Sequence, residues 1–578
     1  MKDLYKNLKF AWGYAKESKK YLILLMIANI INVIFGIVTP ILSARIIIEL
    51  TNNDYSRIIL VAGAMFLVEF ISDLFSYVSS RCSIKVYRNT LSVLEVDLGR
   101  NVLKLENACL DKNGSGVFIQ RLTNDTSRLA EVFNGVLGMM SQIIKYIGIL
   151  IAVFIVNRLV FLYVLIMLVI LYMLEKIRTD KYKEDDKVSR KADERVSGFF
   201  GELVRGARDI KMLNSEEDFI RELDKRIDEA NYNRLKMRKT SWNYKLCMCQ
   251  FTDLFSFILI ILLVVMMKWG IIVPAISLVL YNYCSNVIYS VYLIGDLLGY
   301  IKDFNLSSER IFDIIDSDDF KKEEFGTRHL AKVNGDFEFR DVTFGYNEKV
   351  VLDKLNFKIK ANETVAFVGK SGAGKTTIFN LLCKMYDNYS GTITIDGIDI
   401  RCLDKESIRG NITIISQNPY IFNMSIRDNL RLVKENLTDE EMISACKVAC
   451  LDDFINGLDD GYDTVIGEGG VNLSGGQKQR LAIARALVQK TEIILFDEAT
   501  SALDNETQKK IQEAISNMRD EYTILIIAHR LSTIVNCDRI LFMDNGKIVA
   551  SGTHKELLKN CREYKKLYES EISKNDDF

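Results

Sequence analysis

Two glycine-rich stretches in the second half of the chain have the composition to hold an anion. The first, GKSGAGKTT at residues 369–377, follows the apolar sequence TVAFV and precedes a helix pattern. Its glycines let successive backbone N–H groups surround phosphates, Lys375 supplies a cation, and Thr376 offers a hydroxyl to Mg²⁺. The order of strand, loop and helix predicts a nucleotide-binding P-loop. Nine consecutive residues are then expected to contact the nucleotide: Gly369, Lys370, Ser371, Gly372, Ala373, Gly374, Lys375, Thr376 and Thr377.

The second stretch is LSGGQKQRLAIARAL at residues 473–487. A serine and two glycines open a basic helix here, where free N–H groups and the helix dipole favour negative charge. The chain therefore carries two candidate anion sites, and the P-loop alone does not explain the second.

Polar residues also end several apolar strand sequences in this half. Asp497 and Glu498 close IILFDE, and because ligands gather at the carboxyl edge of such sheets, Asp497 is expected to hold Mg²⁺. Glu498 is placed to orient or deprotonate an attacking water. His529 follows TILIIA, from where it can reach the γ-phosphate, and Gln417 follows ITIIS, from where it can touch Mg²⁺ or the water.

Tyr346, in FGYNEK ahead of the P-loop, can stack on an adenine ring or belong to the core, as strand aromatics usually do. The elements that must position these residues begin near residue 336, where strand and helix patterns alternate. This alternation is typical of an α/β nucleotide-binding domain.

The overall composition averages two unlike halves. The chain has 578 residues, of which 49% are hydrophobic and 26% charged, but residues 1–308 hold nearly all the long apolar runs. A net charge of −1 gives no basic excess for nucleic-acid binding, so DNA and RNA are excluded as partners. The eleven cysteines lack a framework spacing and are expected to be reduced thiols.

Six segments approach the roughly 20 apolar residues that a membrane-spanning helix needs. They lie near 21–47, 58–80, 133–156, 159–174, 247–267 and 271–298. The first has lysines before it but no cleavage pattern, which favours a retained span over a signal peptide. Long, charged, helix-patterned loops near 81–132 and 175–246 are rich in Lys and Arg, which places them and the C-terminal half in the cytoplasm.

Five charged residues lie inside the apolar runs and carry a functional hypothesis by default. They are Glu69, Asp73, Lys145, Asp253 and Asp296. In one interpretation, these residues pair across the helix bundle or lie beyond the bilayer. In the other, they line a cavity, and their excess of acids would suit cationic or amphipathic cargo.

Together, GKSGAGKTT, Gln417, LSGGQ, ILFDE, SALD and IIAHR, in this order, resemble the nucleotide-binding domain of an ATP-binding cassette (ABC) transporter. With six spans ahead of it, the chain is similar over almost its whole length to the half-transporter exporters of that family. The resemblance implies a transmembrane domain over 1–308, a linker over 309–332 and an ABC nucleotide-binding domain over 333–578.

The resemblance also implies that two cassettes dimerise head to tail, with one ATP between the P-loop of one chain and the LSGGQ of the other. Residues Ser474, Gly475, Gly476 and Gln477 would supply the second half of the site. It further implies adenine stacking by Tyr346, Mg²⁺ coordination by Thr376, Gln417 and Asp497, and hydrolysis by Glu498. His529 would sense the γ-phosphate, and Asp504 would communicate between the two sites. Gly469 stands where the family commonly has arginine, which puts transmission contacts there in doubt.

The implied function is ATP-driven export across the cytoplasmic membrane by alternating access. Closure of the cassettes would pull on short loop helices near 114–122 and 207–213. The sequence leaves homodimer and heterodimer open, and drug, lipid, peptide and metal-chelate cargo open, with amphipathic molecules favoured. An ATP-gated channel, a sensing or regulatory membrane ATPase, and an importer are the competing interpretations.

Overall fold

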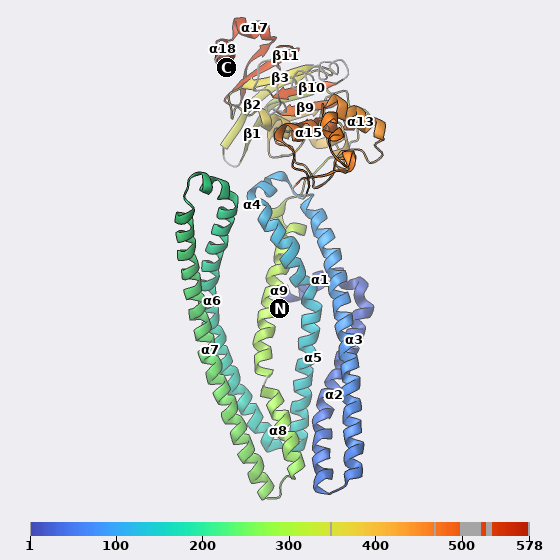
Figure 1. The fold of residues 1–578 in the computed structure, drawn as a ribbon, viewed down its shortest axis with the longest axis vertical. Coiled ribbons are helices and arrows are strands. Elements are labelled where there is room, and N and C mark those ends of the chain that lie inside the picture. The colour runs from blue at the N-terminus through green and yellow to red at the C-terminus, as the bar shows by residue number, and fades with distance from the viewer. Residues whose placement is uncertain are drawn as a thin grey trace. The chain divides into compact units, whose positions relative to one another are not determined.

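A computed structural model of the protein describes residues 2–288, 290–346, 349–467, 470–497, 522–527 and 534–575. The chain divides into two compact units (Figure 1). The helical unit consists of Met1–Lys104 and Asn113–Phe320, and the α/β unit consists of Leu105–Lys112 and Lys321–Phe578.

The helical unit is built mainly from long helices that run lengthwise beside one another, together with three helices of at most 15 residues, α1, α4 and α8 (Figure 1). They are α1 (Lys2–Ala15), α2 (Lys19–Thr51), α3 (Tyr55–Val102), α4 (Asn107–Gln120), α5 (Thr126–Val156), α6 (Arg158–Met212), α7 (Glu216–Lys268), α8 (Pro274–Ile288) and α9 (Ser290–Asp316). Helix α4 begins in the α/β unit and ends in the helical unit. A short π-helix, Arg121–Asp125, joins it to α5.

Within the described ranges, five helical stretches are long and apolar enough to cross a membrane. They are Leu4–Leu50, Tyr55–Val102, Asn107–Val156, Arg158–Met212 and Glu216–Lys268. The sixth predicted span, 271–298, is divided between α8 and α9 at residue 289, which lies outside the described residues. The predicted spans therefore correspond to helices, and a count of six is compatible with them.

These helices continue well beyond a bilayer. Helix α6 has 55 residues and is therefore about 80 Å long, whereas the hydrocarbon core is about 30 Å thick. The charged segments near 81–132 and 175–246 are mostly helical continuations of the spans. This confirms the long helix extensions expected from the sequence.

The surface of the helical unit suits a lipid environment. Large apolar side chains such as Ile59, Leu60 and Phe66 are each about two-thirds or more exposed. A buried cluster that includes Val153, Val160 and Leu280 holds α5, α6 and α8 together. The apolar exterior and this buried core are those expected of a helix bundle surrounded by lipid.

The α/β unit contains two larger sheets in its described ranges (Figure 1). The order β2-β1-β4-β5 forms an antiparallel sheet of β1 (Phe337–Tyr346), β2 (Lys349–Ile359), β4 (Ser390–Ile395) and β5 (Ile398–Asp399). The order β12-β11-β3-β10-β9-β6 forms a mainly parallel sheet of β3 (Thr364–Gly369), β6 (Ile412–Ile415), β9 (Ile493–Asp497), β10 (Thr523–Ile527), β11 (Arg539–Asp544) and β12 (Lys547–Gly552). The short strands β7 (Met424–Ser425) and β8 (Val465–Ile466) pair separately.

Helices pack around the mainly parallel sheet, some directly on its strands and some on other helices. They are α10 (Lys375–Leu382), α11 (Lys405–Arg409), α12 (Ile426–Arg431), α13 (Asp439–Val448), α14 (Asp452–Asn456), α15 (Gly475–Gln489), α17 (His554–Asn560) and α18 (Arg562–Asn575). The central strands are buried on both faces, which explains their continuous apolar sequences. In β3, Val365 and Phe367 join the core shared with α10 and β1, whereas Ala366 and Val368 join the core shared with α13 and α15.

Leu105–Lys112, which precedes most of the helical unit in sequence, belongs to the α/β unit. Leu105 bridges to Lys322, and the Glu106 N–H donates to the carbonyl of Lys321 at 2.9 Å. This segment lies directly ahead of residues 114–122, the predicted loop helix. Residues 105 and 106, directly ahead of α4, therefore pair with residues 321 and 322 inside the α/β unit.

Candidate nucleotide-binding site

The P-loop lies between β3 and α10, as its sequence predicts. Gly372 and Gly374 have φ values of +80° and +97°, a region that glycine adopts without strain. A Cβ at Gly374 would lie 2.6 Å from Cδ2 of Leu352, so a side chain does not fit there. The loop can therefore turn its backbone N–H groups inward and lead directly into the N-terminus of α10, where the helix dipole favours an anion.

Lys375 is folded over this loop. Its side chain is buried, and Nζ donates hydrogen bonds to the carbonyls of Gly369 at 2.9 Å and Lys370 at 3.0 Å. Burial of an ammonium group requires such partners. The arrangement holds the cation within the loop.

Thr376 connects the P-loop to the end of a second strand. Its Oγ1 donates to Oδ1 of Asp497 at 3.2 Å, and Asp497, the last residue of β9, is 9% exposed. The two residues are far apart in sequence, and the sheet brings them together because β10 pairs in parallel with both β3 and β9. A hydroxyl and a carboxylate at this separation are the hard oxygen ligands that Mg²⁺ prefers.

Gln417 follows β6 at the same carboxyl edge, because β6 pairs in parallel with β9. The residue is exposed, and its backbone carbonyl accepts a hydrogen bond from Nε2 of Gln479 at 3.2 Å. Gln479 is buried and lies on α15, the helix that LSGGQ opens. A hydrogen bond thus links the segment after β6 to the signature helix.

Three predicted site residues are not among those that the structure describes. Glu498, Asp504 and His529 lie in the ranges 498–521 and 528–533. Their neighbours Asp497 and Ile527 end β9 and β10, which lie side by side.

Tyr346 ends β1 beside α10. Its hydroxyl lies 3.4 Å from Oγ1 of Thr377 and 3.4 Å from Nδ2 of Asn380, both on α10. The ring is 37% exposed and packs edge to face on Tyr386, with centroids 5.3 Å apart. Tyr346 therefore presents a partly open aromatic ring next to the P-loop helix, as a base-stacking residue requires.

LSGGQ forms a helix N-terminus with a complete cap. Ser474 is the N-cap of α15: its Oγ accepts from the N–H of Gln477 at 3.2 Å, while Oε1 of Gln477 accepts from the N–H of Ser474 at 2.8 Å. This capping box fixes the loop, and Ser474 and Gly475 are exposed. The capped helix N-terminus predicted as a second anion site is therefore ordered and exposed.

Sequence reasoning missed Tyr386 and Asp111. The Tyr386 hydroxyl donates to Oδ2 of Asp111 at 2.6 Å, and burial together with this hydrogen bond raises the pKa of the Tyr386 phenol. Asp111 lies on α4, and Tyr386 contacts Tyr346. Both partners are distant in sequence from Tyr386, so no local pattern indicates the contact.

The fold and the site define a P-loop ATPase domain in one chain with a membrane-spanning helical unit. Residues 352–501 match the sequence profile described as "ABC transporter", and residues 22–291 match that of the "ABC transporter transmembrane region". The chain belongs to the ABC transporter family.

Two relatives match the chain over most of its length, and a third matches under half of it. It is 30% identical to the uncharacterized ABC transporter ATP-binding protein YfiC of Bacillus subtilis, covering 99% of this chain and 95% of the relative. It is 31% identical to the ATP-dependent lipid A-core flippase of Escherichia coli K12, covering 86% of each. The flippase of Francisella tularensis is 43% identical over 46% of this chain and 43% of its own length.

The protein is thus a multi-pass membrane half-transporter of the exporter type, with its ATP-binding domain in the cytoplasm. It binds and hydrolyses ATP to drive export. The channel, sensor and importer interpretations are not favoured.

Proposed function

We propose that two copies of this chain form the transporter, and that each ATP binds between the P-loop of one copy and LSGGQ of the other. The observation that carries the proposal is the ordered, exposed helix cap at Ser474. This cap can bind an anion, and it is not part of the P-loop of the same chain. Both half-sites are present in one chain, so two copies complete two sites. An isologous dimer of this kind makes ATP part of the interface.

Mg²⁺ would be held by Thr376, Asp497 and Gln417. The pair of Thr376 and Asp497 supports this assignment because its oxygens are 3.2 Å apart at the mouth of the P-loop. The ion would supply charge neutralisation for the phosphates. In this proposal Lys375 and the loop N–H groups bind the phosphates, and Tyr346 stacks on the adenine.

The remaining roles fall on residues at the neighbouring strand ends. Glu498 would orient the attacking water and accept its proton, His529 would contact the γ-phosphate, and Asp504 would pass the state of one site to the other. ATP can close the dimer only if it binds the closed state more tightly than the open one. In the shared site, the closed dimer binds ATP more tightly than the open dimer, because LSGGQ contacts the nucleotide only when the dimer is closed.

The cargo we propose is an amphipathic, lipid-like molecule. Glu69, Asp73, Asp253 and Asp296 are exposed in a single chain, Lys145 is half-buried, and none of the five makes an ion pair within the described ranges. Charges in apolar helices normally face a polar cavity or a partner, so we place them toward the space between two copies. Two of the relatives above are named for a lipid substrate, lipid A-core.

The first test is ATP hydrolysis by the full chain alone in lipid nanodiscs, with the mass of the particle determined. We expect robust turnover from a particle that contains two copies, and stimulation by an amphipathic cargo. A two-copy particle that binds ATP without hydrolysing it would favour a heterodimer with a different half-transporter. A monomeric particle with full turnover would contradict the shared site.

The contact between Tyr386 and Tyr346 gives a second test. Tyr386→Ala removes the ring that packs edge to face on Tyr346 and is expected to weaken ATP binding about threefold to tenfold, because such ring pairs contribute about 0.5–1.5 kcal/mol. Tyr386→Phe keeps the ring and loses only the hydrogen bond to Asp111, so its ATP affinity should match that of the wild type. Equal weakening in both variants, measured by titration with a fluorescent ATP analogue, would show that the ring contact does not position Tyr346.

A further inference from the structure

A groove in the helical unit lies where the N-terminal helix meets the first span. It has a volume of about 480 Å³ and is bounded by α1, the start of α2 and α5. Its walls are mainly apolar and include Trp12, Ile23, Met26 and Leu137. Lys9 and Lys19 are the two charged residues that line it.

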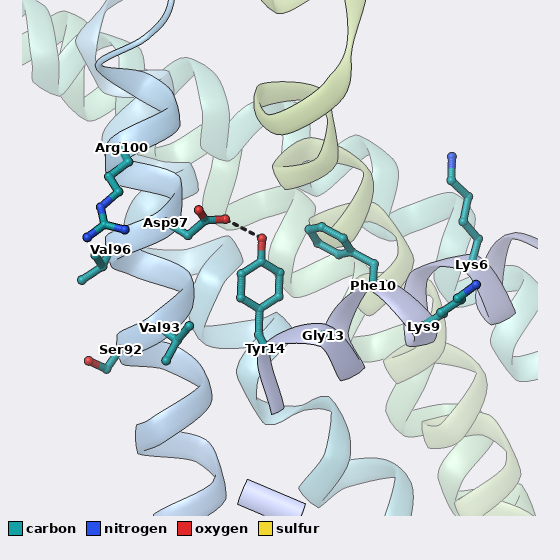
Figure 2. A pocket seen from close by; sticks show the side chains of 10 residues that line it. All are labelled: Lys6, Lys9, Phe10, Gly13, Tyr14, Ser92, Val93, Val96, Asp97 and Arg100. Atoms are coloured by element: carbon teal, nitrogen blue, oxygen red, sulfur yellow. Dashed lines mark hydrogen bonds between the residues drawn. The ribbon is translucent and has the colours of Figure 1, made fainter. Parts of the chain in front are cut away.

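Helix α1 is anchored, so the groove is preformed. Figure 2 shows the neighbouring pocket between α1 and α3, where the Tyr14 hydroxyl donates to Oδ2 of Asp97 at 2.7 Å. Asn7 donates to Asn305 of α9 at 3.0 Å. In the groove itself, the ring of Trp12 packs edge to face on Phe133, with centroids 5.9 Å apart. Three neighbouring helices therefore hold α1 in place.

The groove lies at the cytoplasmic boundary of the hydrocarbon. The apolar run of α2 begins at Tyr21, directly after Lys19 and Lys20. Ile23 and Met26, in the first turns of this run, are about half exposed at 48% and 47%. Trp12 is 41% exposed, and aromatic residues of this kind are enriched at the membrane interface. The apolar wall of the groove thus adjoins the acyl region, and its lysines adjoin the headgroups.

Within the described residues, the two lysines have no acidic side chain at ion-pair distance. Both are exposed, and neither forms an ion pair with any side chain in the described part of the chain. The cytoplasmic leaflet carries anionic lipids, whose headgroups attract Lys and Arg close to the surface. A phosphate with an attached acyl chain complements both the charge and the apolar wall, whereas free phosphate complements only the charge.

We propose that this groove binds one anionic phospholipid of the cytoplasmic leaflet. The phosphate lies between Lys9 and Lys19, and an acyl chain follows Ile23, Met26 and Leu137. The lipid is a bound ligand of the fold and not the exported cargo. By filling the space between α1, α2 and α5, it ties the N-terminal helix to two spans.

The test is lipid retention by the purified full chain in native mass spectrometry, with phosphatidylglycerol or phosphatidylcholine added. The double variant Lys9→Gln/Lys19→Gln is expected to hold phosphatidylglycerol about tenfold more weakly than the wild type. The matched control, Lys16→Gln/Lys20→Gln, removes the same charge from the same leader but outside the groove, and should retain the lipid. Equal loss in both double variants, or equal retention of phosphatidylcholine and phosphatidylglycerol by the wild type, would overturn the proposal.

A second pair of variants tests the apolar wall. Ile23→Trp fills the groove and should reduce phosphatidylglycerol retention, whereas Ile34→Trp changes a similarly exposed position on α2 outside the lining and should not. Helix content and melting temperature identify a variant that fails to fold. If Ile23→Trp retains the lipid but loses the mass of the dimer, a second copy occupies the groove. If soluble glycerol phosphate displaces the lipid fully, the groove is a simple anion site. Either result would overturn the proposal.

Discussion

Glu498→Gln is expected to bind ATP with wild-type affinity and to hydrolyse it about 10²–10⁴-fold more slowly, the range associated with loss of a general base. Glu498 follows Asp497, whose carboxylate lies 3.2 Å from the Thr376 hydroxyl at the P-loop. In the proposed site, this next residue in the sequence orients the water that attacks the γ-phosphate and accepts its proton. Glutamine keeps the size and the hydrogen-bonding capacity of the side chain but cannot accept the proton.

The measurement is steady-state phosphate release beside equilibrium ATP binding, in the same nanodisc preparation. Glu492→Gln is the matched control, because Glu492 precedes β9 at the opposite end of the strand and should tolerate the change. Residual turnover above about a tenth of the wild-type rate in Glu498→Gln would contradict the assigned role. Reduced ATP affinity in this variant would instead assign Glu498 to ground-state binding.

The residues of the nucleotide site that sequence reasoning found share a local signature. The P-loop is contiguous, and its glycines, lysine and threonine act through one turn that neighbouring residues specify. The approach of Asp497 to Thr376 could be inferred as well, because parallel strands place their carboxyl ends at one edge of the sheet. Candidate site residues at the carboxyl ends of parallel strands can therefore be predicted from a single sequence.

The contacts that sequence reasoning missed have no such signature. Tyr386 meets Asp111, and Gln479 meets the carbonyl of Gln417, across long separations in the chain. The local sequence around each of these residues contains no motif that indicates a contact. The partner of each residue is known only from the tertiary structure. Contacts of this kind link the start of α4 to Tyr386, and the signature helix to the segment after β6.

Helix lengths were predictable only inside the lipid. Hydropathy identified about 20 apolar residues in each span, but α6 and α7 continue as one polar pair far beyond that. Outside the bilayer they are held together by ion pairs such as Arg234 with Asp193 at 2.6 Å and Arg195 with Glu229 at 3.2 Å. The sequence predicted these extensions as charged, helix-patterned segments, but it did not predict their ion pairs, because the partners lie far apart in the chain.

Ser474→Arg is expected to leave ATP binding to the P-loop intact and to abolish closure, so that hydrolysis falls to background. The exposed N-cap of α15 would then carry a long side chain that fills the space where the proposal places the phosphates of the ATP bound by the other copy. Ser474→Ala is the control for the cap itself: it removes one capping hydrogen bond, which costs about 1 kcal/mol of helix stability, and should reduce hydrolysis only modestly. Normal hydrolysis in Ser474→Arg would contradict the shared site.

A mixture of two inactive variants separates a site shared between copies from a site within one copy. In a dimer of one Lys375→Ala copy and one Ser474→Arg copy, a shared arrangement places both changes in one site and leaves the other intact. Two sites that each lie within one copy would both be damaged. In a Glu498→Gln background that prevents hydrolysis, the mixed dimer should therefore retain one tightly held ATP after gel filtration, while each parent dimer retains none. Absence of retained ATP in mixed dimers of confirmed composition would show that each ATP is bound within one copy. The exposed cap at Ser474 would then not bind the ATP of the other copy.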